Sequence, residues 1–273
     1  MISEESVDSR PYIEIPAKSL RSIVGPPVAI AKDGLTNFYW SNDGLRIQTV
    51  SPSNSIVINQ EVRPPVFYDY NIPYEIGEFV FGTKCKTIHE LLKAANREEI
   101  VSIEFDTNAQ YLTIRFSEVS YTLSGVDPEA PDEPDLPELN HDVVLRANPE
   151  VFDMANQVIG MVSESMQFEV TKNQFKISGK GDSDSAEIDA EIKTSRDSLK
   201  EAEGDCAAMI ESVSTPAVAS FGSRLVSHIS EFTTPHPLSV FLREDYPLRI
   251  ETSREQNRIF REIIIAPRMD STN

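Results

Sequence analysis

The sequence is poor in cysteine and in glycine. Cys85 and Cys206 are the two cysteines among 273 residues, and neither belongs to a Cys-x-x-Cys pair or has a histidine at ligand spacing. A disulfide framework and a zinc site are therefore not indicated, and we expect both thiols to be buried. Only 11 glycines are present, and none forms a glycine-rich loop suited to cradling phosphate, which argues against a nucleotide-dependent enzyme.

Long apolar runs are also missing. No stretch approaches the roughly 20 apolar residues that a membrane-spanning helix needs. The amino-terminal segment MISEESVDSR has neither the basic start nor the apolar core of a signal peptide. We therefore expect a soluble protein of the cytoplasm without a membrane partner.

Positive charge is scarce. The chain has 25 Lys and Arg against 44 Asp and Glu, a net charge of -19 at pH 7. This argues against a protein that holds nucleic acid mainly through a large basic surface, because that affinity comes from cations displacing counterions from phosphates. In multimolar salt the Debye length falls to about 3 Å and carboxylates repel one another little. The acidity therefore suggests a halophilic source.

The two halves of the chain resemble each other. Phe38–Ile47 aligns without a gap on Phe168–Ile177, matching an aromatic residue, a turn and an apolar-basic-Ile ending. Apolar residues alternate on both sides of the Asn42-Asp43-Gly44 turn, as expected of half-buried strands. The repeat predicts two similar domains of about 130 residues, each large enough to bury its own core.

Amphipathic patterns predict helices at equivalent places in the two halves. They cover residues 19–30 and 87–97 in the first half and 149–163 and 220–232 in the second, and strands follow the later helix of each pair. Gly25-Pro26-Pro27 is expected to kink or shorten the first helix, because proline lacks a backbone donor and clashes with the preceding turn. The predicted fold class is α+β.

A proline-rich, acidic segment joins the halves. Residues 127–139 favour an extended connector over a packed element. The expected organisation is an acidic extension at 1–10, a first domain at 11–126, the connector at 127–140 and a second domain at 141–273.

Several short landmarks follow one another along the chain. They are Asp43–Ile47, Tyr121–Leu123, Asp127-Pro128, Glu133–Pro137, Gly181–Asp184, Asp245–Ile250 and Ile263–Met269. Their order, on top of the repeat, resembles the DNA polymerase sliding clamps of archaea and eukaryotes, the proliferating cell nuclear antigen (PCNA) family, over roughly residues 11 to 270. The resemblance implies two repeated DNA-clamp domains per chain, with helices lining the inside of a homotrimeric ring and β-sheets outside.

The resemblance also implies a function in DNA replication. Such a ring encircles duplex DNA, acts as a processivity factor for DNA polymerase and docks replication and repair proteins; it is not an enzyme and needs no cofactor or metal. The implied partners are DNA, other copies of the chain, the clamp loader, and DNA polymerase, ligase and nucleases that bind through PCNA-interacting peptides. The implied location is the cytoplasm, on the nucleoid.

Three groups of residues match functional positions of the family. The residues that would face DNA are Arg21, Lys86, Lys93, Arg97 and Arg224; the third helix departs from the pattern, since its polar surface has no cation. The trimer interface would pair residues 118–123 with residues 186–192 of the next subunit, through Tyr121, Leu123, Ala186, Ile188 and Ile192. The partner-peptide pocket would comprise Val50, Val57, Leu136, Pro247, Ile264, Ile265, Ala266 and Pro267.

Two alternatives stay open. The acidic extension, the Gly-Pro-Pro sequence and the cation-free third helix would suit a specialised or virus-encoded clamp paralogue with altered partners. An acidic metal-dependent enzyme has less support: Asp182-Ser-Asp184 resembles the start of a calcium loop, but Glu187 and Lys193 stand where that loop requires Gly and Glu.

Overall fold

The computed structural model describes residues 10–126, 139–232, 236–254 and 258–268. The chain divides into two compact units. Unit 1 comprises Met1–Thr49, Asn59–Pro134 and Glu255–Ile259, and unit 2 comprises Val50–Ile58, Asp135–Arg254 and Phe260–Asn273. The predicted 1–10 extension, up to residue 9, and most of the predicted connector, including Leu136, lie outside the described residues.

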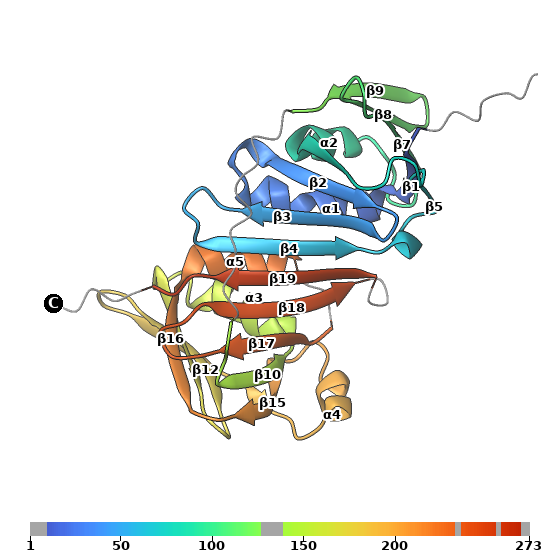
Figure 1. The fold of residues 1–273 in the computed structure, drawn as a ribbon. Coiled ribbons are helices and arrows are strands. Elements are labelled where there is room, and N and C mark those ends of the chain that lie inside the picture. Colours follow the sequence, from blue (N-terminus) through green and yellow to red (C-terminus); the bar gives the residue numbers. More distant parts are fainter. Residues whose placement is uncertain (1–9, 127–138, 233–235, 255–257, 269–273) are drawn as a thin grey trace, which may run out of the picture. The chain divides into compact units, whose positions relative to one another are not determined.

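Unit 1 has two helices and two groups of neighbouring strands in its described part (Figure 1). One sheet has the strand order β5-β1-β7-β8-β9, and in the other group β4, β3, β2 and β6 are neighbours in that order. The elements are β1 (Tyr12–Pro16), α1 (Ala17–Ile30), β2 (Leu35–Ser41), β3 (Gly44–Val50), β4 (Ile56–Val62), β5 (Asp69–Asn71), β6 (Phe79–Lys84), α2 (Cys85–Leu92), β7 (Ile100–Asp106), β8 (Tyr111–Phe116) and β9 (Val119–Ser124), with short 3-10 turns at Lys32–Gly34 and Pro64–Val66.

Helix α1 runs without interruption through its two prolines, so the expected shortening is wrong. Because Pro27 has no N–H, the carbonyl of Ile23 loses its partner in the helix. The side-chain amide of Gln60, which is fully buried, donates to that carbonyl at 3.1 Å. A residue of β4 therefore replaces the hydrogen bond that proline removes.

Aromatic packing forms the centre of unit 1. Trp40, which is buried, contacts Phe38, Phe67, Tyr70 and Phe105, with ring centroids 5.1 to 6.3 Å apart. The alternation that the sequence shows on either side of the β2–β3 turn places this cluster on one face of the strands. Cys85 is buried as expected, and burial raises the pKa of its thiol, whereas Cys206 in unit 2 is half-buried.

Unit 2 repeats this plan. Strands β13, β12, β11 and β16 form one sheet, and β14, β15, β10, β17, β18 and β19 are neighbours in that order. The elements are β10 (Val143–Ala147), α3 (Pro149–Val158), β11 (Ser165–Val170), β12 (Phe175–Lys180), β13 (Ser185–Asp189), β14 (Glu191–Ile192), α4 (Arg196–Glu201), β15 (Ala207–Val213), β16 (Ala217–Gly222), α5 (Ser223–Phe232), β17 (Leu238–Leu242), β18 (Leu248–Arg254) and β19 (Ile259–Ile265).

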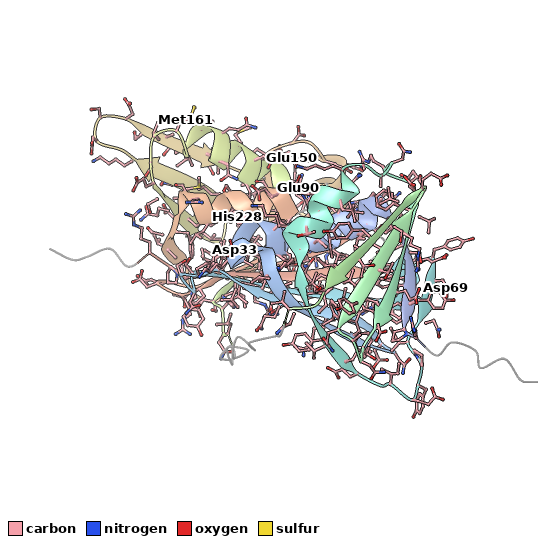
Figure 2. All side chains as sticks on the ribbon, turned by 90° about the horizontal axis from the view of Figure 1, so that it is seen from above. Asp33, Asp69, Glu90, Glu150, Met161 and His228 are labelled. Atoms are coloured by element: carbon pink, nitrogen blue, oxygen red, sulfur yellow. The ribbon has the colours of Figure 1, made fainter. Side chains whose placement is uncertain are left out.

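The two units correspond strand by strand. The order β4-β3-β2-β6 of unit 1 matches β13-β12-β11-β16 of unit 2, and β1-β7-β8-β9 matches β10-β17-β18-β19. In each unit two helices pack side by side, α1 with α2 and α3 with α5 (Figures 1 and 2). The predicted α+β class is confirmed, and the sequence repeat has a structural counterpart.

Candidate functional site

Four of the five cations expected to face DNA lie on α1, on α2 or just after α2 in unit 1, and Arg21 takes part in the packing of the two helices. Its guanidinium group, on α1, donates to the main-chain carbonyls of Leu92 and Ala95, the latter at 2.7 Å. These carbonyls lie at and just beyond the end of α2, where a helix leaves acceptors without partners and a cation is favourable. Arg21 therefore joins α1 to α2 and caps the second helix.

The other cations in this region of unit 1 differ in whether a carboxylate pairs with them. The ammonium group of Lys93 pairs with the carboxylate of Glu90 at 2.7 Å and holds the pKa of that carboxyl group below its usual value. Lys86 and Arg97 are exposed. Lys18, which the family positions did not indicate, is also exposed and pairs with Glu98 at 2.9 Å. Lys86 and Arg97 are thus the cations most available to a ligand.

The helix pair of unit 2 has a different surface. Helix α3 has no Lys or Arg, and its exposed side chains include Met154, Gln157 and Val158. Met161, in the turn after the helix, is 79% exposed and projects from that end in Figure 2. Arg224 lies in the first turn of α5 and is exposed. Cation-free α3 is therefore also partly apolar on its outer side.

The expected interface residues of unit 1 lie on a sheet edge. Strand β9 is the last strand of its sheet and pairs on one side with β8. Tyr121 and Leu123 face the same side of the sheet as their neighbours Ile114 and Leu112, and Tyr121 is 40% exposed. The outer edge of β9 therefore offers backbone groups together with an exposed aromatic side chain.

The expected interface residues of unit 2 divide between two sheets. Ala186 and Ile188 lie on β13, which is also an edge strand, and face the same side as Ile177. Ile192 lies on β14, which pairs in parallel with β15 in the other group of strands. The continuous strand expected over residues 186–192 is therefore interrupted, and Ile192 does not share the edge of β13.

The expected partner-peptide positions that the structure describes all lie in unit 2. Ile265 is fully buried, and Val57 and Ile264 are each 7% exposed, so these side chains belong mainly to the core. Val50, Pro247, Ala266 and Pro267 are half-buried. The N–H of Ala266 donates to the carbonyl of Ser55 at 2.9 Å, which joins the segment after β19 to the loop between β3 and β4.

His141 was not among the expected residues, although it lies beside Pro247. Its ring packs against Phe241 and Tyr246, and Nε2 is 3.1 Å from the carbonyl oxygen of Pro247. Burial is the largest cause that lowers the pKa of His141, and the nearby Arg249 and Arg243 add to it. A single histidine without ligand spacing gave no sequence signal for this packing.

The described residues offer neither a metal site nor a membrane-spanning helix. Within them, no group of three or more His, Cys, Asp or Glu side chains could hold a metal ion. In the same part of the chain, no helix combines the length and apolar character needed to cross a membrane.

Several known proteins are similar to this chain over most of its length. No family model matches the chain. The DNA polymerase sliding clamp of Methanococcoides burtonii is 24% identical over 239 residues, 86% of this chain and 89% of that protein. The sliding clamp of Methanothrix thermoacetophila is 26% identical over 259 residues, 94% of this chain and 97% of the relative. The chain is a relative of the DNA polymerase sliding clamps.

Solved structures show the same fold. Archaeoglobus fulgidus PCNA, in a complex with the C-terminal region of FEN-1, superposes with a TM-score of 0.78 at 22% identity, covering 96% of this chain and 99% of the other. PCNA from Entamoeba histolytica gives a TM-score of 0.79 at 17% identity, covering 95% and 99%. The resemblance to the sliding-clamp family and the clamp fold that it implies are confirmed.

Proposed function

We propose that this protein is a DNA sliding clamp, a ring that encircles duplex DNA and holds a DNA polymerase and other proteins on it. The relatives named DNA polymerase sliding clamp, which match most of the chain, support this function. The observation that carries the proposal is the strand-by-strand repeat of one α+β unit within the chain. Encirclement also suits a net charge of -19, because a topological link needs no strong contact with phosphates.

The ring would close through the edges of β9 and β13. Each edge belongs to a different unit, so joining β9 of one chain to β13 of the next is a head-to-tail contact, which gives a ring when the rotation closes. Three chains would follow the family pattern. No charged residue occurs in β9 from Val119 to Ser124, whereas β13 carries Glu187 and Asp189. A neutral edge opposite an acidic one limits like-charge repulsion at the contact.

The duplex would run alongside the paired helices. Lys86 and Arg97 supply available cations from unit 1 and Arg224 supplies one from unit 2. Arg21 and Lys93 would act more weakly, because the first holds carbonyls of the fold and the second is paired with Glu90. The low number of free cations favours sliding over tight binding.

Partner proteins would dock on unit 2. The half-buried Val50, Pro247, Ala266 and Pro267 would form the apolar floor, and Leu136 would contribute from the connector. The related A. fulgidus PCNA binds the C-terminal region of FEN-1, and we propose that nucleases, ligase, polymerase and clamp loader bind this chain through short peptides in the same way. The protein would have no catalytic role of its own.

Synthesis by the cognate DNA polymerase on a singly primed circular template tests this function. With its clamp loader, the protein is expected to increase the length of DNA that the polymerase makes each time it binds the template. Leu136→Ala should weaken the binding free energy of a partner peptide by about 1 to 3 kcal/mol. The stimulation of synthesis should fall with it, while the native mass stays the same. Absence of any stimulation by the unmodified protein would contradict the proposed function.

A further inference from the structure

A cleft of about 660 Å³ lies within unit 2, where the turn after α3, the start of α5 and the segment after β19 meet. Met161, which is 79% exposed at the end of α3 in Figure 2, and the neighbouring Val162 give it apolar lining. Arg268 lines it from the segment after β19, and Arg224 lines it from the first turn of α5. Methionine and arginine are enriched where proteins dock on one another, so this lining suits a protein partner.

Arg268 is held in place while its charge stays available. Its main-chain N–H donates to the carbonyl of Ser220 at 2.7 Å. Its Nη1 donates at 3.3 Å to the main-chain carbonyl of Glu164, the acidic residue of the cleft lining. Among the described residues no carboxylate pairs with Arg268, whereas Arg196 of the same unit pairs with Glu211 at 2.8 Å. The cleft therefore presents an oriented guanidinium group without a paired anion.

The cleft adjoins the residues proposed for the partner-peptide pocket. Ala266 and Pro267 belong to that pocket and are half-buried, and the exposed Arg268 follows them directly. The N–H of Ala266 donates to the carbonyl of Ser55 in the loop between β3 and β4, whereas the N–H of Arg268 donates to the carbonyl of Ser220 on β16. One short segment of unit 2 therefore connects the pocket to the cleft.

This continuity limits where a peptide bound in the pocket can place a charged residue. Two residues of extended chain span at most about 7 Å. A peptide that lies on Ala266 and Pro267 therefore reaches Arg268 with a residue about two or three positions beyond its apolar anchors. A carboxylate at that position would meet the guanidinium group, whereas an ammonium group there would be repelled.

We propose that this cleft binds an acidic residue of a partner protein, next to the apolar anchors that the partner-peptide pocket receives. A guanidinium group can donate two parallel N–H groups to a carboxylate, which an ammonium group cannot. Met161 suits variable neighbours of that carboxylate, because an unbranched thioether side chain adapts its shape. Arg268 is the main contact, since it lies outside the helix pair, and Arg224 adds positive charge from α5. This inference rests on the proposed function and names the chemistry of the peptides that the pocket would select.

Fluorescence anisotropy of labelled peptides tests the cleft. The probe is the C-terminal region of FEN-1 that A. fulgidus PCNA binds, with two Glu, two Gln or two Lys residues placed at one end or the other of its apolar residues. At one of these ends, the Glu peptide should bind about twofold to fivefold more tightly than the Gln peptide at low salt, and the Lys peptide should bind more weakly. This preference should shrink as salt rises, because screening weakens an exposed ion pair.

Substitutions in the protein show whether Arg268 causes the preference. Arg268→Gln should abolish it while the Gln peptide binds as it does to the unmodified protein; a disturbed fold would instead weaken all the peptides alike. Arg268→Lys should keep part of the preference, and Arg224→Gln should reduce it. The matched control is Arg196→Gln, which removes the same charge from an exposed arginine on α4 of the same unit and should behave as the unmodified protein.

Equal affinities of the Glu and Gln peptides for the unmodified protein would overturn the inference, as would a preference for Glu that survives Arg268→Gln or is lost equally in Arg196→Gln. A preference that survives while Arg268→Gln weakens binding of a duplex of about 20 base pairs would assign Arg268 to DNA. Binding of the Gln peptide without any gain from Glu would reject the cleft alone. Failure of every peptide to bind, together with no stimulation of DNA synthesis, would reject the proposed function as well.

Discussion

The two helix pairs share one backbone plan but differ on their outer surfaces. In unit 1, α1, α2 and the residues after α2 carry Lys18, Arg21, Lys86, Lys93 and Arg97, whereas in unit 2 the pair carries only Arg224 among the described residues. The inward side of each helix is fixed by packing on its sheets, because a change of volume there costs stability. The outward side is free of that constraint, so repeats that keep one fold can acquire different surfaces.

The comparison also shows that counting cations overstates the charge a surface offers. Arg21 caps α2, Lys93 pairs with Glu90 and Lys18 pairs with Glu98. The helix pair of unit 2 carries fewer cations, but Arg224 has no carboxylate partner in the described part of the chain. The two helix pairs therefore differ less in available charge than in the number of cations.

The largest expected effect is the loss of the proposed contact between β9 of one chain and β13 of the next. Tyr121→Ala removes an exposed side chain from β9, and we expect the native mass in molar salt to fall from three chains to one of 30.5 kDa, while circular dichroism and the melting temperature stay the same. Tyr111→Ala on β8 of the same sheet is the control, because Tyr111 is similarly exposed but lies on an inner strand. A trimer that survives Tyr121→Ala would place the contact elsewhere.

A second expected effect concerns α1, which has two internal prolines where α3 has none. Gln60→Leu leaves the carbonyl of Ile23 without a donor and should lower the free energy of unfolding by about 1 to 3 kcal/mol. Adding Pro27→Ala supplies an N–H to that carbonyl, so the double variant should recover part of the loss in urea denaturation. If Gln60→Leu lowers the free energy of unfolding equally in the unmodified chain and in Pro27→Ala, Gln60 acts through other contacts.

The third test makes α3 resemble the helices of unit 1. Gln157→Lys adds a cation to the exposed side of α3, and we expect duplex affinity at low salt to rise about threefold, with a slope of log K against log salt that is steeper by about 0.9. Asn173→Lys adds the same charge in the turn between β11 and β12. Equal gains from both variants would mean that net charge, and not the position of α3, determines DNA binding.

The smallest expected effect is the pH response of unit 2. The folded state lowers the pKa of His141, mainly through burial, so the unfolded chain takes up a proton more readily. Stability is therefore full above the ordinary histidine pKa of about 6.5 and decreases as the pH falls through it toward the lower folded value. His141→Phe should reduce the change in melting temperature between neutral and mildly acidic pH. An identical pH response in His141→Phe would remove this histidine from the explanation.

Much of the fold could be predicted from the sequence because its signals are local. Alternation around the Asn42-Asp43-Gly44 turn predicts β2 and β3, and the repeat carries this prediction to β11 and β12. Helix ends were less accurate, since α2 ends at Leu92 and not at Arg97, and α3 ends at Val158 and not at Ser163. Arg21 supplies the cap of α2 from 71 residues away, and no local pattern contains that information.

The candidate sites depended on family resemblance and on tertiary contacts to different degrees. The resemblance to the clamp family placed Tyr121 and Ile188 on interface strands, and in the structure both residues lie on edge strands. The burial of Ile265 and the break before Ile192 could not be predicted from the sequence, because apolar residues have the same pattern in a core and in a docking surface. Arg224 and Arg268 line the same cleft of unit 2 only in the folded chain, so neither residue predicts that cleft from the sequence.

Retention on closed DNA tests the central claim most directly. The protein would be loaded by its clamp loader onto nicked circular DNA, and the DNA-bound fraction would be measured by gel filtration before and after one cut with a restriction enzyme. We predict that the protein stays with the circle near molar salt and leaves once the DNA is linear, unless the ends are blocked, because the link is topological and salt weakens phosphate contacts. Retention on linear DNA with open ends, or no retention on the circle, would contradict the account of this protein as a sliding clamp.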